Sequence, residues 1–161
     1  MSTLDCNTPT GRKFIKSQDL AAKLFAAKYG LDLFQTNPTS SADIDAFFAH
    51  DGQLVGIAEI KSRNMTEADL RRFGSYLITH EKIVKGMALS ASLQVQFLLI
   101  VYLRFDKSMF CWQVTDATGK QVAPFTVEAT RTQETCNGGS IVRQNAFFPV
   151  EDGKLINLKQ A

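Results

Sequence analysis

Hydrophobic and polar positions along the first third of the chain change from a helical period to an alternating one. Within residues 17–29 the apolar positions fall one, three and four apart, which predicts an amphipathic helix with Ser17 as its N-cap and Gly30 at its end. Residues 31–36 alternate apolar and polar side chains and predict a short strand. Residues 43–63 then form two apolar runs around an Asp-Gly dipeptide, which predicts a β-hairpin.

A second helical pattern follows the hairpin. Thr66 and Asp69 match a capping box with Asp in place of Glu, and the apolar series after them runs through residues 70–87. Gly74 and Gly86 interrupt this series. The pattern therefore predicts either one helix or two.

The second half of the chain reads mainly as strands. Residues 93–105 and 109–115 predict two strands turned at "FDKS". After residue 117, glycines and prolines divide the tail into short pieces, and those that look extended are 123–130, 140–150 and 154–158. The order of elements predicts an α/β fold with a mixed central sheet flanked by helices, followed by a β-rich tail at 117–161.

Length and composition set limits on the class of protein. With 161 residues, 45% hydrophobic and 21% charged, we expect one folded domain over residues 1–161. The longest apolar run, 97–103, is too short for a membrane helix, and residues 1–14 lack the apolar region of a secretory signal. Three widely spaced cysteines favour free thiols, so we expect a cytoplasmic protein, in the nucleoid or in the host cell if the chain is viral.

The hairpin "DIDAFFAHDGQLVGIAEIKSR" places Asp43, Asp45, Glu59 and Lys61 within otherwise apolar strands. A three-residue loop would pair positions whose numbers sum to 104 and set Asp45 opposite Glu59, with all four charges on one face. A two-residue turn would pair positions summing to 103 and send the carboxylates to opposite faces. A shared site therefore depends on the loop.

Facing carboxylates resist ionising together unless a cation lies between them. Oxygen ligands favour Mg²⁺ or Mn²⁺, which binds through one or two carboxylates together with water and phosphate oxygens. Lys61 would point at the same site, where it could hold a phosphate or help to activate water. These residue types fit hydrolysis of a phosphodiester.

The same residues resemble the signature hairpin of the PD-(D/E)XK nuclease superfamily, with Asp45 as the first acid and Glu59-Ile60-Lys61 as the second motif. The likeness covers about residues 14–115 and implies a restriction-endonuclease-like αβββαβ core and a Mg²⁺-dependent deoxyribonuclease. In that resemblance Asp43 is an alternative first ligand. Asp19 is the candidate for the acidic residue that many members carry on the first helix.

A DNA substrate is implied by the resemblance and fits a local excess of basic residues. Residues 61–107 contain eight Lys and Arg against four Asp and Glu. The candidate DNA contacts are Arg63, Arg71, Lys82 and Lys85. A homodimer would suit a junction resolvase.

Two other interpretations of the charged hairpin stay open. The domain could be a catalytically silent DNA-binding or assembly module with the same fold. Alternatively, the charges could form a buried ion pair in a protein that binds neither DNA nor metal.

Overall fold

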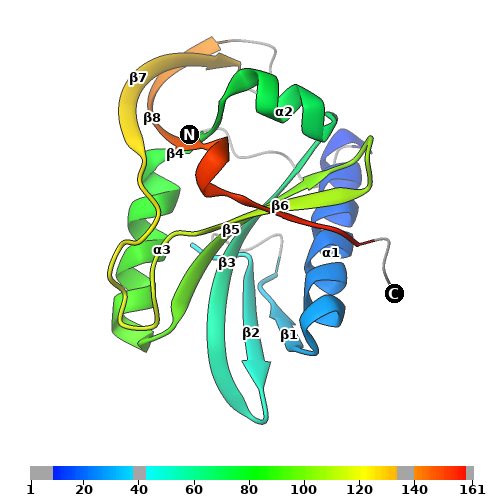
Figure 1. Ribbon diagram of the computed structural model, residues 1–161, viewed down its shortest axis with the longest axis vertical. Helices are drawn as coiled ribbons and strands as arrows, with labels where there is room; N and C mark the ends of the chain where they lie inside the picture. The colour runs from blue at the N-terminus through cyan, green and yellow to red at the C-terminus, as the bar shows by residue number, and fades with distance from the viewer. Residues whose placement is uncertain (1–8, 38–42, 134–139, 159–161) are drawn as a thin grey trace.

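A six-stranded mixed sheet lies at the centre of the computed structural model, which describes residues 9–37, 43–133 and 140–158 (Figure 1). In chain order the elements are α1 (Pro9–Tyr29), β1 (Asp32–Gln35), β2 (Ala46–His50), β3 (Gln53–Arg63), α2 (Glu67–Phe73), β4 (Ser75–Thr79), α3 (His80–Leu93), β5 (Gln96–Leu103), β6 (Ser108–Gln113), β7 (Thr126–Gln133), β8 (Ser140–Pro149), a 3₁₀ turn (Val150–Asp152) and β9 (Lys154–Ile156). Among the described residues, no helix is long and apolar enough to cross a membrane.

The central sheet has the strand order β1-β2-β3-β5-β6-β9. β3 and β5 run parallel, and the other neighbouring pairs are antiparallel. A parallel pair requires a crossover, which here contains α2, β4 and α3. The mixed α/β arrangement predicted from the sequence is confirmed.

Strands of the C-terminal tail complete two different sheets. β8 pairs with β4 on one side and with β7 on the other, and these three strands form a second, antiparallel sheet. β9 pairs with β6 and extends the edge of the central sheet. The predicted β-rich tail is therefore joined to the middle of the chain by strand pairing.

The two faces of the central sheet bury separate apolar clusters. On one face α1 packs on β3 and β5, where Ala22 and Phe25 meet Ala58 and Ile60. The other face is covered by α2, α3 and the second sheet, and its cluster includes Ile57, Leu99, Trp112 and Phe148. Figure 1 shows α1 and α3 on opposite sides of the sheet. Successive residues of β3 therefore point alternately toward α1 and toward α3.

Two predicted boundaries are wrong. The first helix begins at Pro9, so Ser17 lies inside it and its hydroxyl contacts the Ser62 hydroxyl instead of capping the helix. The segment expected to continue the second helix forms β4, because α2 ends at Gly74 and residues 75–79 find hydrogen-bonding partners in β8. The capping box of Thr66 and Asp69 is confirmed, with the Asp69 N–H donating to Thr66 Oγ1 at 3.1 Å.

α3 approaches β5 closely at Gly86. A Cβ atom added at this position would overlap the ring of Phe97, whose side chain is fully buried. The packing therefore requires a residue without a side chain in the middle of a helix, where glycine itself is unfavourable by about 1 kcal/mol relative to alanine.

We expect Gly86→Ala to destabilise the protein by about 1–3 kcal/mol, because overlap with Phe97 outweighs the gain in helix propensity. Urea unfolding measures the change, with Ser92→Ala on the exposed surface of the same helix as the control. Greater stability of Gly86→Ala would show that the ring moves aside at little cost.

Candidate metal centre and active site

The β2–β3 hairpin brings Asp45 and Glu59 together through a turn and a β-bulge, and the sequence did not indicate the bulge. The turn has two residues, Asp51 and Gly52, both with positive φ (49° and 76°), as a type I′ turn requires. His50 therefore pairs with Gln53, in the register that separates the carboxylates. Of the two alternatives that the sequence left open, the two-residue turn is therefore the one present.

A β-bulge then restores the other register. Ala49 pairs with Leu54, but Phe48 pairs with Gly56, so Val55 is an extra residue on β3. From this point the paired positions sum to 104, as in Ala46 with Ala58. The predicted facing of Asp45 and Glu59 is therefore present, and the bulge produces it.

Asp45 lies immediately before β2 and is held by the backbone of β3. Its N–H donates to the carbonyl of Ala58 at 3.2 Å, and its Oδ2 accepts the N–H of Ile60 at 2.8 Å. These two bonds flank Glu59 on the opposite strand. They fix the Asp45 carboxylate on the same edge of the hairpin as the Glu59 side chain.

Glu59 is a buried carboxylate, 1% exposed, in the middle of the apolar strand β3. Lys61 Nζ lies 2.9 Å from Glu59 Oε1 and pairs with it, and the Lys61 side chain is 23% exposed. Glu59 Oε2 has no partner. A buried carboxylate with an oxygen that accepts nothing is costly unless a further cation or donor approaches it.

Burial and the nearby Glu59 carboxylate raise the pKa of Asp45 to about 6, although Lys61, the Ile60 N–H and Lys82 act in the opposite direction. Burial alone would lower the pKa of Lys61, but Glu59 and Asp45 outweigh it and raise this pKa above its ordinary value. Lys61 therefore stays charged at neutral pH. One ammonium group faces two carboxylates, so a further positive charge would be favourable at this site.

The structure does not bring the other two acidic candidates to this pair. The Asp43 side chain is 55% exposed, and its Oδ1 lies 3.1 Å from Lys85 Nζ on α3. Asp19 lies on α1, which covers the face of β3 opposite to Glu59, and its Oδ1 accepts from Gln35 Nε2 at 2.9 Å. Helix α1 therefore cannot supply a ligand to the Glu59 side of the sheet.

The donor set fits a hard divalent cation. No group of three or more His, Cys, Asp and Glu side chains gathers anywhere in ranges 9–37, 43–133 and 140–158. Mg²⁺ and Mn²⁺ need only one or two carboxylates, since water and substrate phosphate oxygens complete their shells. Asp45 and Glu59, whose Oε2 is unpartnered, provide such a pair of carboxylates.

The four candidate DNA contacts lie in different surroundings. Arg63 lies over the ring of Tyr76, 5.7 Å from its centroid. Arg71 pairs with Glu67 at 2.7 Å and lies over a ring in the core, whereas Lys85 is shared between two carboxylates. Lys82 lies partly buried on α3, close enough to Asp45 to lower its pKa. Lys82 is therefore the basic residue of α3 that acts on the acid pair.

Tyr76 is a further buried polar residue close enough to Glu59 and Lys61 for their charges to act on it, and the sequence pattern did not indicate it. Its side chain is 4% exposed and its hydroxyl has no hydrogen-bond partner. Its position was hidden because residues 75–79 were assigned to a helix. The alternation within "SYLIT", which buries Tyr76 and Ile78, is the signal that could have revealed it.

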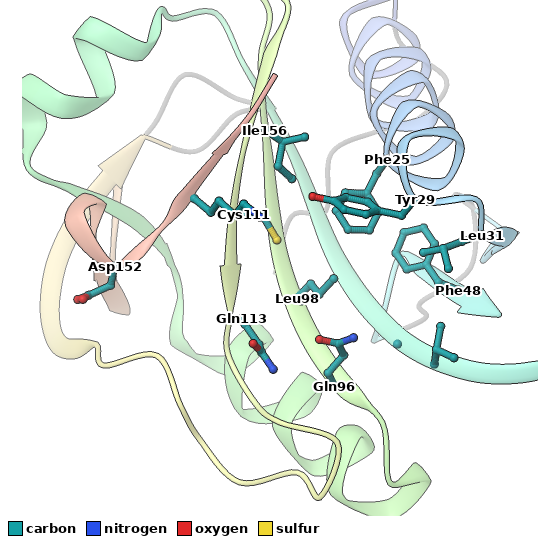
Figure 2. Close-up of a pocket in the computed structure, with 13 residues that line it drawn as sticks. Phe25, Tyr29, Leu31, Phe48, Gln96, Leu98, Cys111, Gln113, Asp152 and Ile156 are labelled. Atoms are coloured by element: carbon teal, nitrogen blue, oxygen red, sulfur yellow. The ribbon is translucent and has the colours of Figure 1, made fainter. Parts of the chain in front are cut away.

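Two cavities lie outside the acid pair. One, of about 620 Å³, lies on the α1 face, and Figure 2 shows Phe25 and Tyr29 facing Leu98 and Cys111 across it. Burial raises the pKa of the free Cys111 thiol to about 12, so it stays protonated. The other, of about 680 Å³, lies between α3 and β8 and is lined partly by Lys85 and Arg143. The second cavity therefore shares Lys85 with the surroundings of the site.

A mixed sheet with an aspartate before one strand and Glu-x-Lys on the next defines a protein of the PD-(D/E)XK superfamily. A family model described as "Phage putative PDDEXK endonuclease" matches residues 16–143, and the chain belongs to this family. Comparisons with curated proteins and with solved structures gave no significant match. The predicted superfamily is confirmed, and the match extends beyond the expected core into β8.

The raised pKa of Asp45 predicts that the free energy of unfolding of the metal-free protein depends on pH. The folded state binds this proton more tightly than the unfolded state, because the pKa is about 6 instead of 3.8. The contribution of Asp45 to stability is therefore fully present below about pH 4 and is lost as the pH rises through about 6, by on the order of 3 kcal/mol. Asp45→Asn, which cannot ionise, should lose less stability over this range in EDTA.

Urea unfolding at about pH 4 and about pH 7 measures this difference. Asp51→Asn, in the exposed turn, is the control and should follow the wild type. Parallel profiles for the wild type and Asp45→Asn would contradict the proposed proton linkage.

Proposed function

We propose that this protein is a metal-dependent deoxyribonuclease that hydrolyses phosphodiester bonds at Asp45, Glu59 and Lys61. The observation that carries this proposal is the buried Glu59 carboxylate, whose Oε2 has no donor although a second carboxylate and the Lys61 ammonium group lie beside it. A purely structural ion pair would be expected to satisfy both carboxylate oxygens with donors.

Asp45 and Glu59 would hold Mg²⁺ or Mn²⁺. The bound ion would polarise the phosphate and lower the pKa of a water molecule. The β3 backbone keeps the Asp45 carboxylate in place through the Ile60 N–H, so this ligand is oriented before any ion binds. Burial of Asp45 and, after it, repulsion from Glu59 raise the pKa of Asp45, and both effects favour the binding of a cation between the two carboxylates.

Lys61 would act on the phosphate. Its ammonium group remains charged and partly exposed beside Glu59, so it can reach both the acid pair and a bound substrate. Hydrolysis adds a water oxygen to phosphorus and breaks the bond to the leaving sugar oxygen, and negative charge builds up on the phosphoryl oxygens. A fixed ammonium group stabilises that charge and can orient the attacking water.

The surface beside the site offers a route for the DNA backbone. Lys82 lies close enough to Asp45 to lower its pKa, and Lys85, one turn further along α3, lines the cavity between α3 and β8 together with Arg143. Basic side chains along such a path contact phosphates and position the substrate without reading its sequence. This arrangement supports DNA as the substrate and places Arg143, from the tail, next to α3.

We expect Lys61→Met and Glu59→Gln each to reduce DNA cleavage at least about 100-fold while the protein remains folded. Supercoiled, linear and branched DNA are incubated with each protein in Mg²⁺, Mn²⁺ or EDTA. The DNA form cleaved first separates endonuclease, exonuclease and resolvase activity. Lys23→Met on the exposed side of α1 is the control and should cleave as the wild type does.

Other outcomes of this experiment would favour a different function for the protein. DNA binding without cleavage under any condition would favour a catalytically silent module. No binding of DNA and no thermal shift with Mn²⁺ would identify the hairpin charges as a structural ion pair. Cleavage by Lys61→Met at the wild-type rate would overturn the assignment of this residue.

We expect Lys82→Met to weaken DNA binding uniformly across sequences. Loss of one phosphate contact should reduce the slope of log affinity against log salt by about 1. Fluorescence anisotropy in Ca²⁺ or EDTA at several salt concentrations measures this slope. Lys23→Met again serves as the control, and an unchanged slope for Lys82→Met would place the DNA elsewhere.

A further inference from the structure

The hydroxyl of Tyr76 is a second buried polar group without a partner. Tyr76 lies on β4, its side chain is 4% exposed, and no protein group accepts from or donates to its oxygen. A phenol hydroxyl carries one proton to donate, and burying it without a bond costs about 1–3 kcal/mol. A hydrogen-bond partner that is present only when the site is occupied would remove this cost.

The ring of Tyr76 lies over the face of β3 that carries the acid pair. It stacks on Trp112 with centroids 5.9 Å apart and an interplanar angle of 26°. The guanidinium of Arg63 lies 5.7 Å from its centroid. Glu59, Lys61 and Arg63 alternate along β3 and therefore share one face.

The strand register relates the ring to Glu59. Glu59 pairs with Leu99 on β5, and Leu99 pairs with Trp112 on β6, so Glu59 and Trp112 lie in one row across the sheet. Arg63 lies four residues further along β3. A ring in contact with both Trp112 and Arg63 therefore lies beside the stretch of β3 that holds Glu59 and Lys61.

Charges in the site act on this hydroxyl. Burial raises the pKa of Tyr76, Arg63 and Lys61 oppose that change, and Glu59 adds to it. Since the net shift is upward, the hydroxyl remains protonated at neutral pH and has a proton to donate to an anion. Glu59 Oε1 pairs with Lys61, and Glu59 Oε2 has no partner and can accept such a bond.

We propose that Tyr76 is a positioning residue, whose hydroxyl donates toward the Glu59 carboxylate through a water molecule of the loaded site and holds that carboxylate in its ligating orientation. This inference rests on the proposed function, because it assigns a role within the same metal centre. Groups that hold metal-ligating side chains in place typically change metal affinity or activity by 10- to 100-fold when removed.

The test compares Tyr76→Phe with Tyr102→Phe, which removes a buried tyrosine hydroxyl on the α1 face of the same sheet. Calorimetric titration with Mn²⁺ alone gives the metal affinity, urea unfolding in EDTA gives the stability, and steady-state cleavage gives kcat and KM. Tyr76→Phe keeps the ring on Trp112, so the fold is retained.

For Tyr76→Phe we expect Mn²⁺ affinity and kcat to fall roughly 10- to 100-fold and the KM for DNA to be maintained. The stability in EDTA should be maintained or increased, because the substitution removes a buried hydroxyl that has no partner in the metal-free protein. Tyr102→Phe should match the wild type in Mn²⁺ affinity and kcat. If Tyr76→Phe keeps the wild-type Mn²⁺ affinity and kcat, whatever its stability in EDTA, the hydroxyl does not act on the metal centre, and that result overturns the inference. A wild type that binds no Mn²⁺ overturns the proposed metal site itself, and the role of Tyr76 with it.

Discussion

Placing an ionised carboxylate in the interior of a sheet opposes folding, and the arrangement around Glu59 follows from that cost. Transfer of such a group from water costs several kcal/mol even after the protein relaxes. Lys61 offsets part of this cost at 2.9 Å, whereas Asp45 on the facing strand adds to it. The rest of the fold must therefore be stable enough to hold an unfavourable cluster, and the two apolar layers on either side of β3 provide that stability.

The elements that could be predicted are those whose signal is local. The capping pattern of Thr66 and Asp69 depends on two residues three apart, and the apolar run of β5 needs only its own composition. β4 could not be predicted in this way, because the strand exists by pairing with β8, about seventy residues later in the chain. Ser17 was misassigned for a similar reason, since its partner is Ser62 of β3.

The acid pair was predicted from spacing, but its geometry was not. The residues Asp45, Glu59 and Lys61 are visible in the sequence, and the structure places them together. Asp43 and Asp19 match the same chemistry and lie elsewhere, since Asp43 turns to Lys85 and α1 covers the wrong face. Strand alternation and the helix that covers each face of the sheet decide which carboxylates share a site. Residue type alone indicates neither of these.

Because Val55 is an extra residue on β3, the face on which Glu59 lies depends on whether the number of residues in the hairpin is odd or even. Inserting or removing one residue in one strand between Asp45 and Glu59 would turn every later side chain of β3 to the other face of the sheet. An odd number of such insertions or deletions would therefore turn Glu59 and Lys61 toward α1. Even changes leave the faces as they are, and an odd change is harmless only when a bulge appears or disappears with it. Relatives of this chain can therefore vary in the length of the hairpin while keeping the site, and a search pattern with one fixed spacing would fail to find them.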